Sequence, residues 1–85
     1  MKFAKKRPEA LWPLIAWHLI TVSSSWKYFV DLRVDFPGAD QVGRRTVFNI
    51  GGNKFRLIAR VNYEFPNVYI LQILTHSEYD KERWQ

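Results

Sequence analysis

The sequence predicts a single α+β domain, residues 1–85, in which N-terminal helices pack on one face of a small antiparallel sheet. Three observations lead to this prediction. Hydrophobic residues recur at helical spacing in the first half, alternation with a period of two begins at Thr46, and the pair Gly51 and Gly52 separates two strand-like stretches. A chain of 85 residues is long enough for one hydrophobic core and too short for two.

The first predicted helix spans residues 8–22. It is apolar nearly all round, because Trp12 and Trp17 occupy faces outside the main hydrophobic stripe. A helix without a polar stripe is normally buried on more than one side. We therefore expect a partner protein to cover this helix, and Trp12 or Trp17 to be exposed in the isolated chain.

A second helix is predicted after three consecutive serines. Ser25 is the expected N-cap, residues 26–33 carry the apolar positions, and the helix ends before Pro37. Residues 36–40 are then expected to form a turn.

The second half predicts a three-stranded antiparallel meander. Its strands are residues 46–50, residues 54–63 and residues 68–75, with a hairpin turn at residues 51–53. The third strand is a continuous apolar, β-branched and aromatic run, so we expect it at the centre of the sheet. Residues 76–84 are predicted to be a short polar helix or tail.

The net charge of +5 is unevenly distributed. The stretch from Gln41 to Tyr63 contains no acidic residue, and it holds five of the thirteen basic residues: Arg44, Arg45, Lys54, Arg56 and Arg60. Such a segment indicates a polyanionic partner, although charge alone is equally compatible with an ordinary solvated face.

Strand alternation places Lys54, Arg56, Arg60 and Asn62 together on the face opposite the core. Side chains two residues apart on a strand are about 6.5 to 7 Å apart, so this row could follow successive phosphates of an extended single strand of nucleic acid. The arginine fork can grip a phosphate through two hydrogen bonds. The alternative is that these residues simply form the solvent side of a half-covered sheet.

His76 and Tyr79 are the candidate proton-transfer residues. An imidazole is suited to moving protons near neutral pH, and a tyrosine three residues later lies on the same side of a helical turn. The alternative is a histidine that only forms hydrogen bonds at a strand end.

The sequence argues against several other chemistries. There is no cysteine, no His/Asp/Glu cluster has metal-ligand spacing, and the glycine pair lies between strands and not before a helix, as a phosphate-binding loop would require. We therefore expect no metal and no cofactor. RNA can still be cleaved, because its own 2′-hydroxyl can attack the adjacent phosphate when the protein supplies a base, an acid and cations.

The apolar stretch of residues 10–22 is shorter than the roughly 20 residues that span a bilayer, and no signal-peptide cleavage site follows it. We expect a cytoplasmic protein without membrane contact.

Two stretches of the sequence, residues 47–60 and 74–81, resemble the signatures of HigB-type toxins of bacterial type II toxin-antitoxin systems. Ser25 and Trp26, residues 35–37, and the pair Ala39 and Asp40 match the middle of that family. The resemblance extends over residues 26–84 without an evident gap.

This resemblance implies a RelE-like fold and a metal-independent endoribonuclease that cuts mRNA, usually in the ribosomal decoding site, and is silenced by a cognate helix-turn-helix antitoxin. It implies that Lys54, Arg56 and Arg60 bind the scissile phosphate region and that His76 and Tyr79 lie at the cleavage site. Arg44, Arg45 and Lys81 are the implied contacts with the RNA backbone.

The N-terminal region departs from that family. Its members begin with a strand that we expect this chain to lack, which would leave a sheet edge unpaired. Apolar residues also stand where relatives tend to carry polar ones: Leu11, Trp12, Ile15, Leu19 and Ile20. An alternative function is therefore a non-catalytic RNA- or ribosome-binding module, an inactive truncated toxin, and a third is a structural subunit that only binds partners.

Overall fold

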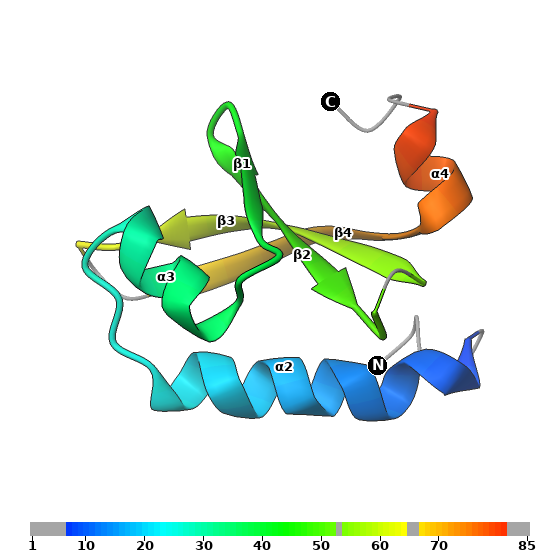
Figure 1. The fold of residues 1–85 in the computed structure, drawn as a ribbon, viewed down its shortest axis with the longest axis horizontal. Coiled ribbons are helices and arrows are strands. Elements are labelled where there is room, and N and C mark those ends of the chain that lie inside the picture. Colours follow the sequence, from blue (N-terminus) through cyan, green and yellow to red (C-terminus); the bar gives the residue numbers. More distant parts are fainter. Residues whose placement is uncertain (1–6, 53, 65–66, 82–85) are drawn as a thin grey trace.

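The computed structural model of the chain describes residues 7–52, 54–64 and 67–81. Its helical elements are η1 (Pro8–Ala10), α2 (Leu11–Ser23), α3 (Phe29–Asp35) and α4 (His76–Asp80). Its strands are β1 (Asp40–Val42), β2 (Arg45–Ile50), β3 (Phe55–Asn62) and β4 (Asn67–Thr75). The strands form one antiparallel sheet in the order β1-β2-β3-β4 (Figure 1), so the predicted α+β class is confirmed.

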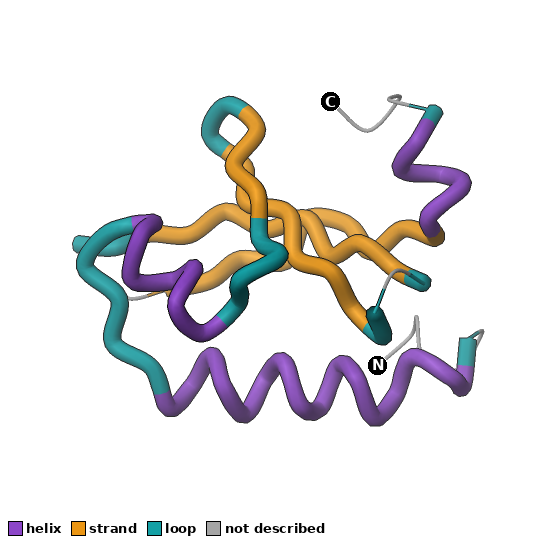
Figure 2. The backbone as a smooth tube through the Cα atoms, viewed as in Figure 1, coloured by secondary structure: helices purple, strands orange, loops and turns teal. Residues whose placement is uncertain are grey.

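The sheet separates the long helix from the short C-terminal one. In Figure 1, α2 runs along one face of the sheet, while α4 rises on the other side beyond the end of β4. The backbone tube in Figure 2 shows the same arrangement, with the β1–β2 hairpin curling away from α2. The sheet therefore has one face covered by helices and a second face bordered by α4.

The main core lies between α2, α3 and the first face of the sheet. The ring of Trp17 meets Phe48 edge to face at 5.4 Å between centroids, and Phe36 meets Phe48 at 5.0 Å. Leu14 and Leu57 are also fully buried in this cluster. Edge-to-face aromatic pairs add to the stability that buried apolar area provides.

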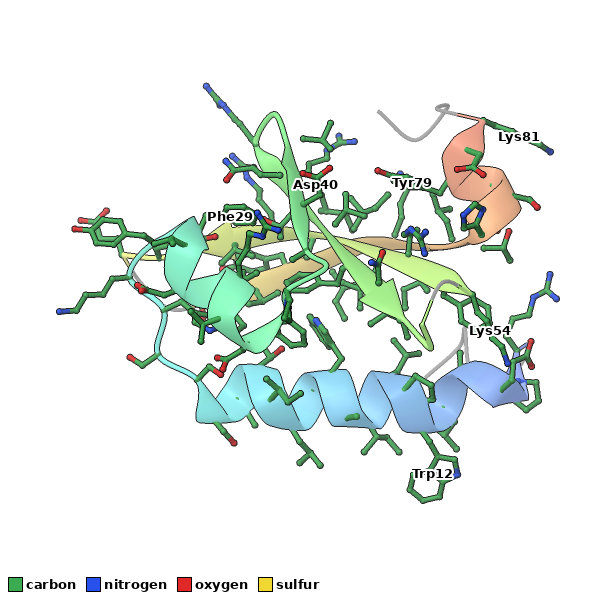
Figure 3. All side chains as sticks on the ribbon, viewed as in Figure 1. Trp12, Phe29, Asp40, Lys54, Tyr79 and Lys81 are labelled. Atoms are coloured by element: carbon green, nitrogen blue, oxygen red, sulfur yellow. The ribbon has the colours of Figure 1, made fainter. Side chains whose placement is uncertain are left out.

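The outer face of α2 remains apolar and exposed, as the sequence predicted. Trp17 is only 6% exposed, whereas Trp12 is 75% exposed and points away from the sheet (Figure 3), which confirms that one of the two tryptophans is accessible. Further exposed apolar side chains lie on the same helix: Leu11, Leu19, Ile20 and Val22.

The prediction of three strands missed β1. Asp40–Val42 pairs with the beginning of β2 across a turn in which Gly43 has a φ of 62°. A strand of three residues is too short to produce a recognisable period of two, so the sequence pattern indicated only a turn there.

The predicted N-cap of the second helix was wrong. Helix α3 begins at Phe29, and the carboxylate of Asp31 accepts the backbone N–H groups of Lys27 and Tyr28, each at 3.1 Å. Those hydrogen bonds satisfy donors that Ser25 was expected to serve, and the helix starts later as a result.

The predicted central position of the last strand was also wrong. Within the described sheet β4 is an edge strand, and Tyr69, Ile70 and Leu71 are all about half exposed. A continuous apolar run usually indicates burial on both faces. Here the run instead leaves an apolar surface along the edge of the sheet.

Asp35 ties the end of α3 to the loop after α2. Its Oδ2 atom lies 2.8 Å from the indole Nε1–H of Trp26 and 2.8 Å from the hydroxyl of Ser24. The hydrogen bond from Trp26, followed by that from Ser24, lowers the pKa of the Asp35 carboxyl below its ordinary value of 3.8.

A folded-state pKa below the unfolded value means that Asp35 contributes stability above pH 3.8, and that this contribution is lost as the pH falls through the lower folded pKa. We expect Asp35→Asn to lower the melting temperature at neutral pH and to flatten the acid limb of the stability curve below pH 3.8. Thermal denaturation between pH 2 and 7 measures both effects. An unchanged acid limb would contradict the role of Asp35.

Two predictions fall on residues that the structure leaves undescribed. The expected lack of the family's first strand concerns the beginning of the chain, where residues 1–6 lie outside the described residues. Residues 82–84 of the predicted C-terminal segment also lie outside them. Within residues 7–52, 54–64 and 67–81, no helix is both long enough and apolar enough to cross a membrane.

Candidate RNA-cleaving surface

Helix α4 is fixed at its start by a capping box. The Thr75 hydroxyl accepts the Glu78 backbone N–H at 3.2 Å, and the Glu78 carboxylate accepts the Thr75 backbone N–H at 2.9 Å. The hydrogen bond from the Thr75 backbone, together with the Thr75 hydroxyl, lowers the pKa of Glu78 below 4.5. The box forms because threonine and glutamate stand three residues apart at the end of a strand.

Two further contacts hold α4 against the sheet. The backbone N–H of His76 donates to the carbonyl oxygen of Lys54 at 3.1 Å, which joins the start of α4 to the turn before β3. Tyr79 packs against a small second cluster on this face of the sheet, built on the buried side chains of Val47 and Ile58. His76 and Tyr79 are therefore anchored to the same end of the sheet.

Arg56 lies beside Tyr79 on this second face. Its guanidinium carbon is 5.6 Å from the centroid of the Tyr79 ring, and its Nη1 donates to the carbonyl oxygen of Phe55 at 3.1 Å. The residue is only 9% exposed, so it is not the solvated side chain that strand alternation suggests. Among the described residues, no carboxylate forms an ion pair with it.

Arg60 lies on the same face of β3 but away from α4. It is the fourth residue after Arg56, which corresponds to about 13 Å along a strand. The hydrophobic pair Val47 and Ile58 lies between them in the sheet register. The structure therefore does not bring together the continuous basic row that the sequence suggested, but divides it into two parts.

The remaining predicted cations occupy the rims of this face. Lys54 is exposed in the turn before β3, and Lys81 is exposed directly after α4 (Figure 3), so both lie next to the helix that carries His76. Arg44 lies in the β1–β2 turn and Arg45 begins β2, at the other end of the sheet. The structure brings Lys54, Arg56, His76, Tyr79 and Lys81 together, and leaves Arg44, Arg45 and Arg60 apart from them.

The sequence argument overlooked Asp80. Its Oδ2 atom lies 2.8 Å from Nδ1 of His76, and both side chains are about half exposed. The spacing of four residues on a helix was a usable signal, because side chains at this spacing are neighbours. The spacing of three residues between Thr75 and Glu78, which is typical of a capping box, was a second signal that the sequence argument did not use.

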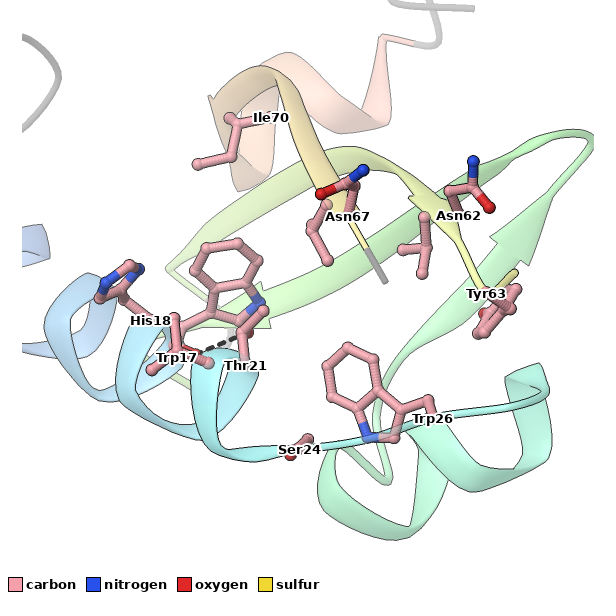
Figure 4. Close-up of a pocket in the computed structure, with 12 residues that line it drawn as sticks. Trp17, His18, Thr21, Ser24, Trp26, Asn62, Tyr63, Asn67 and Ile70 are labelled. Atoms are coloured by element: carbon pink, nitrogen blue, oxygen red, sulfur yellow. Dashed lines mark hydrogen bonds between the residues drawn. The ribbon is translucent and has the colours of Figure 1, made fainter. Parts of the chain in front are cut away.

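A sizeable cavity lies elsewhere in the structure. A pocket of about 600 Å³ lies between α2 and the far ends of β3 and β4, where Trp17, Trp26 and Tyr63 form aromatic walls (Figure 4). His18 lies at this pocket, on the opposite side of the sheet from α4. No lysine or arginine lines it, so the pocket offers no charge complementary to RNA phosphates.

Metal-binding groups are sparse in the part of the chain that the structure describes. No group of three or more histidine, cysteine, aspartate or glutamate side chains comes close enough there to hold a metal ion. The chemistry that these residues themselves offer is proton transfer, hydrogen bonding and neutralisation of negative charge.

This fold and surface define a class: small α+β proteins in which a histidine-bearing C-terminal helix and buried arginine occupy one face of an antiparallel sheet. Residues 11–82 match the family model for HigB_toxin, described as the RelE-like toxic component of a toxin-antitoxin system. The chain belongs to this family.

Curated relatives agree with this family assignment. The chain is 34% identical over 80 residues to the mRNA interferase toxin HigB of Escherichia coli K12, covering 91% of this chain and 77% of the relative. The mRNA interferase HigB of Shigella flexneri gives the same values, and that of Escherichia coli O6:H1 is 28% identical over 81 residues, covering 92% and 79%. The predicted toxin family is thereby confirmed.

Proposed function

We propose that this protein is a toxin that cleaves mRNA on the ribosome, using the surface formed by α4 and the adjoining end of β3. One observation carries the proposal: the buried Arg56 guanidinium lies against Tyr79, on the helix that also presents His76. A cation held in a largely dehydrated position stabilises negative charge far more strongly than a solvated one. The names of the relatives support RNA as the substrate.

The proposed reaction needs no group beyond the RNA and the protein. A base on the protein takes the proton of a 2′-hydroxyl, the 2′-oxygen forms a bond to the adjacent phosphorus, and the bond from phosphorus to the 5′-oxygen breaks. An acid returns a proton to the departing 5′-oxygen. Arg56 and Lys54 neutralise the extra negative charge that the phosphate acquires in the transition state.

Product analysis tests this mechanism. We expect the purified protein, with ribosomes and mRNA, to produce 2′,3′-cyclic phosphate and 5′-hydroxyl ends, because the attacking oxygen belongs to the RNA. A message with a single 2′-deoxy nucleotide at the cleavage position should resist cutting. Products with a 5′-phosphate would contradict the mechanism.

The second candidate function is an RNA- or ribosome-binding module that does not cut. Basic residues at both ends of the sheet face favour it, since Arg44 and Arg60 lie outside the cluster around α4 and suit backbone contacts. Mapping of RNA 5′ ends after induction in a bacterium separates the two. Growth arrest without new 5′ ends would favour the binding module and overturn the nuclease.

We also propose that a helix-turn-helix antitoxin covers the outer face of α2. An exposed tryptophan among exposed apolar side chains is the type of residue that dominates protein interfaces. We expect Trp12→Ala to cost at least about 2 kcal/mol of antitoxin binding, or roughly 30-fold in Kd. Calorimetric titration with the small protein encoded by the neighbouring gene measures this.

A matched control for Trp12 is Val34→Ala, which shortens an exposed apolar side chain on α3. Its affinity for the antitoxin should equal that of the unchanged protein. Equal affinities for all three proteins would place the antitoxin elsewhere on the surface.

A further inference from the structure

We propose that Asp80 is a positioning residue that holds the proton of His76 on Nδ1, so that Nε2 of His76 is the general base of RNA cleavage. The inference rests on the proposed function and deepens it, because the family resemblance leaves the roles of His76 and Tyr79 undivided. It adds a residue, Asp80, to which no role has yet been given.

The geometry of the pair selects the tautomer. The Oδ2 atom of Asp80 lies 2.8 Å from Nδ1 of His76, which is the distance of a charge-assisted hydrogen bond. An ionised carboxylate can only accept, so Nδ1 must donate, and a neutral imidazole has only one proton. Nε2 then carries the lone pair, which is what a base needs to take a proton from a 2′-hydroxyl.

The pair is not required to hold the helix in place. The capping box of Thr75 and Glu78 fixes the start of α4, and Tyr79 anchors it to the sheet. An exposed ion pair between residues four apart contributes little stability. The Asp80 carboxylate is therefore better explained by its effect on the His76 imidazole than by a contribution to the stability of α4.

The charge of Asp80 would be unfavourable on an RNA-facing surface if it acted alone, because a carboxylate repels phosphates. Beside His76 it has a compensating role. When Nε2 takes a proton, the imidazole becomes positive, and the adjacent carboxylate stabilises that charge. The pair is then neutral as a whole, and the phosphate faces the cations Arg56 and Lys54.

The chemical step balances with the groups named. The proton of the 2′-hydroxyl moves to Nε2 of His76, the 2′-oxygen bonds to phosphorus, and the bond to the 5′-oxygen breaks. The 5′-oxygen takes a proton from an acid other than the neutral His76, and Tyr79, three residues further along α4, is the candidate for this acid.

The kinetic test compares Asp80→Asn and Asp80→Ala with the control Asp40→Asn. Asp40 is an exposed acid on β1 opposite Val47, so its replacement removes the same charge from the same face of the sheet without changing α4. We expect single-turnover cleavage of ribosome-bound mRNA to fall about tenfold in both Asp80 variants with an unchanged KM, which is less than the effect where such a carboxylate is buried. The Asp40 variant should match the unchanged protein.

A double-variant cycle separates positioning from a structural effect. In a His76→Ala background, Asp80→Asn should cause no further loss, because Asp80 acts only through the imidazole. A further loss of the same size, or Asp80 variants as active as Asp40→Asn, would overturn the inference while leaving the proposed nuclease in place.

The tautomer itself can be measured without activity. The ¹⁵N chemical shifts of neutral His76, with His18 as an internal reference, should report the Nδ1–H form in the unchanged protein and mainly the Nε2–H form in Asp80→Asn. Identical shifts in both proteins would overturn the inference. If the shifts change but the unchanged protein cuts no RNA, the proposed function fails and the assignment of a catalytic base fails with it.

Discussion

His76→Ala is expected to reduce RNA cleavage by roughly 100- to 10,000-fold, the range that loss of a general acid or base produces. The side chain lies on the first turn of α4, and its backbone N–H, which donates to Lys54, remains in the variant. Alanine is also a good helix former, so the helix should persist. Single-turnover cleavage and growth arrest on induction measure the effect.

The matched control is the only other histidine, His18. It is exposed on α2, on the opposite side of the sheet from α4. His18→Ala should cleave mRNA at the rate of the unchanged protein, and circular dichroism should show both variants folded. Full toxicity of the His76 variant would remove this residue from the cleavage site.

Arg56→Met is expected to reduce cleavage by about 100- to 1,000-fold, the usual effect of removing one preorganised donor to a developing oxyanion. The same change should leave the melting temperature unchanged or raise it. Arg56 is nearly buried and forms no ion pair with a carboxylate of the described residues, so its charge is costly to the folded state. A residue that weakens stability but is needed for activity is typical of a functional site.

Two comparisons sharpen this prediction. Arg33→Met removes an exposed arginine from α3 and should change neither cleavage nor ribosome binding. Arg60→Ala should mainly weaken RNA binding and lower its salt dependence by about one phosphate contact, without a large change in the chemical step. If the Arg56 and Arg60 variants lose activity equally and only through binding, the division of the basic face is functionally irrelevant.

The first helix and the central hairpin could be predicted closely from the sequence because their signals are local. Helix α2 begins and ends within a few residues of the predicted range, and Gly51 and Gly52 adopt positive φ values of 62° and 69° in the turn between β2 and β3. Turn chemistry and helical periodicity depend on neighbouring residues alone.

The position of β4 could not be predicted in this way, because an apolar strand pattern does not say which strands flank it. The β3–β4 pairing also shifts register between Ile58 and Ala59, which strict alternation cannot reveal.

The sequence predicted which residues form the candidate site better than it predicted how those residues are arranged. His76, Tyr79 and Arg56 come together at one end of the sheet, as their pairing across strands required. The burial of Arg56 depends on Tyr79 folding back over the strand, a contact between residues far apart in the sequence. The sequence already indicated that the basic row is interrupted, because Ile58 occupies the position between Arg56 and Arg60 on that face.

The capping box at the start of α4 has a genetic consequence. Because the proposed reactive side chains lie on a five-residue helix whose start depends on hydrogen bonds between Thr75 and Glu78, codons 75–80 form a compact mutational target. Survivors of toxin induction should carry many of their missense changes there. Their protein would still fold and, with the antitoxin bound on α2 as proposed, would still bind it. Such an inactive protein would compete for the antitoxin with any intact copy of the toxin.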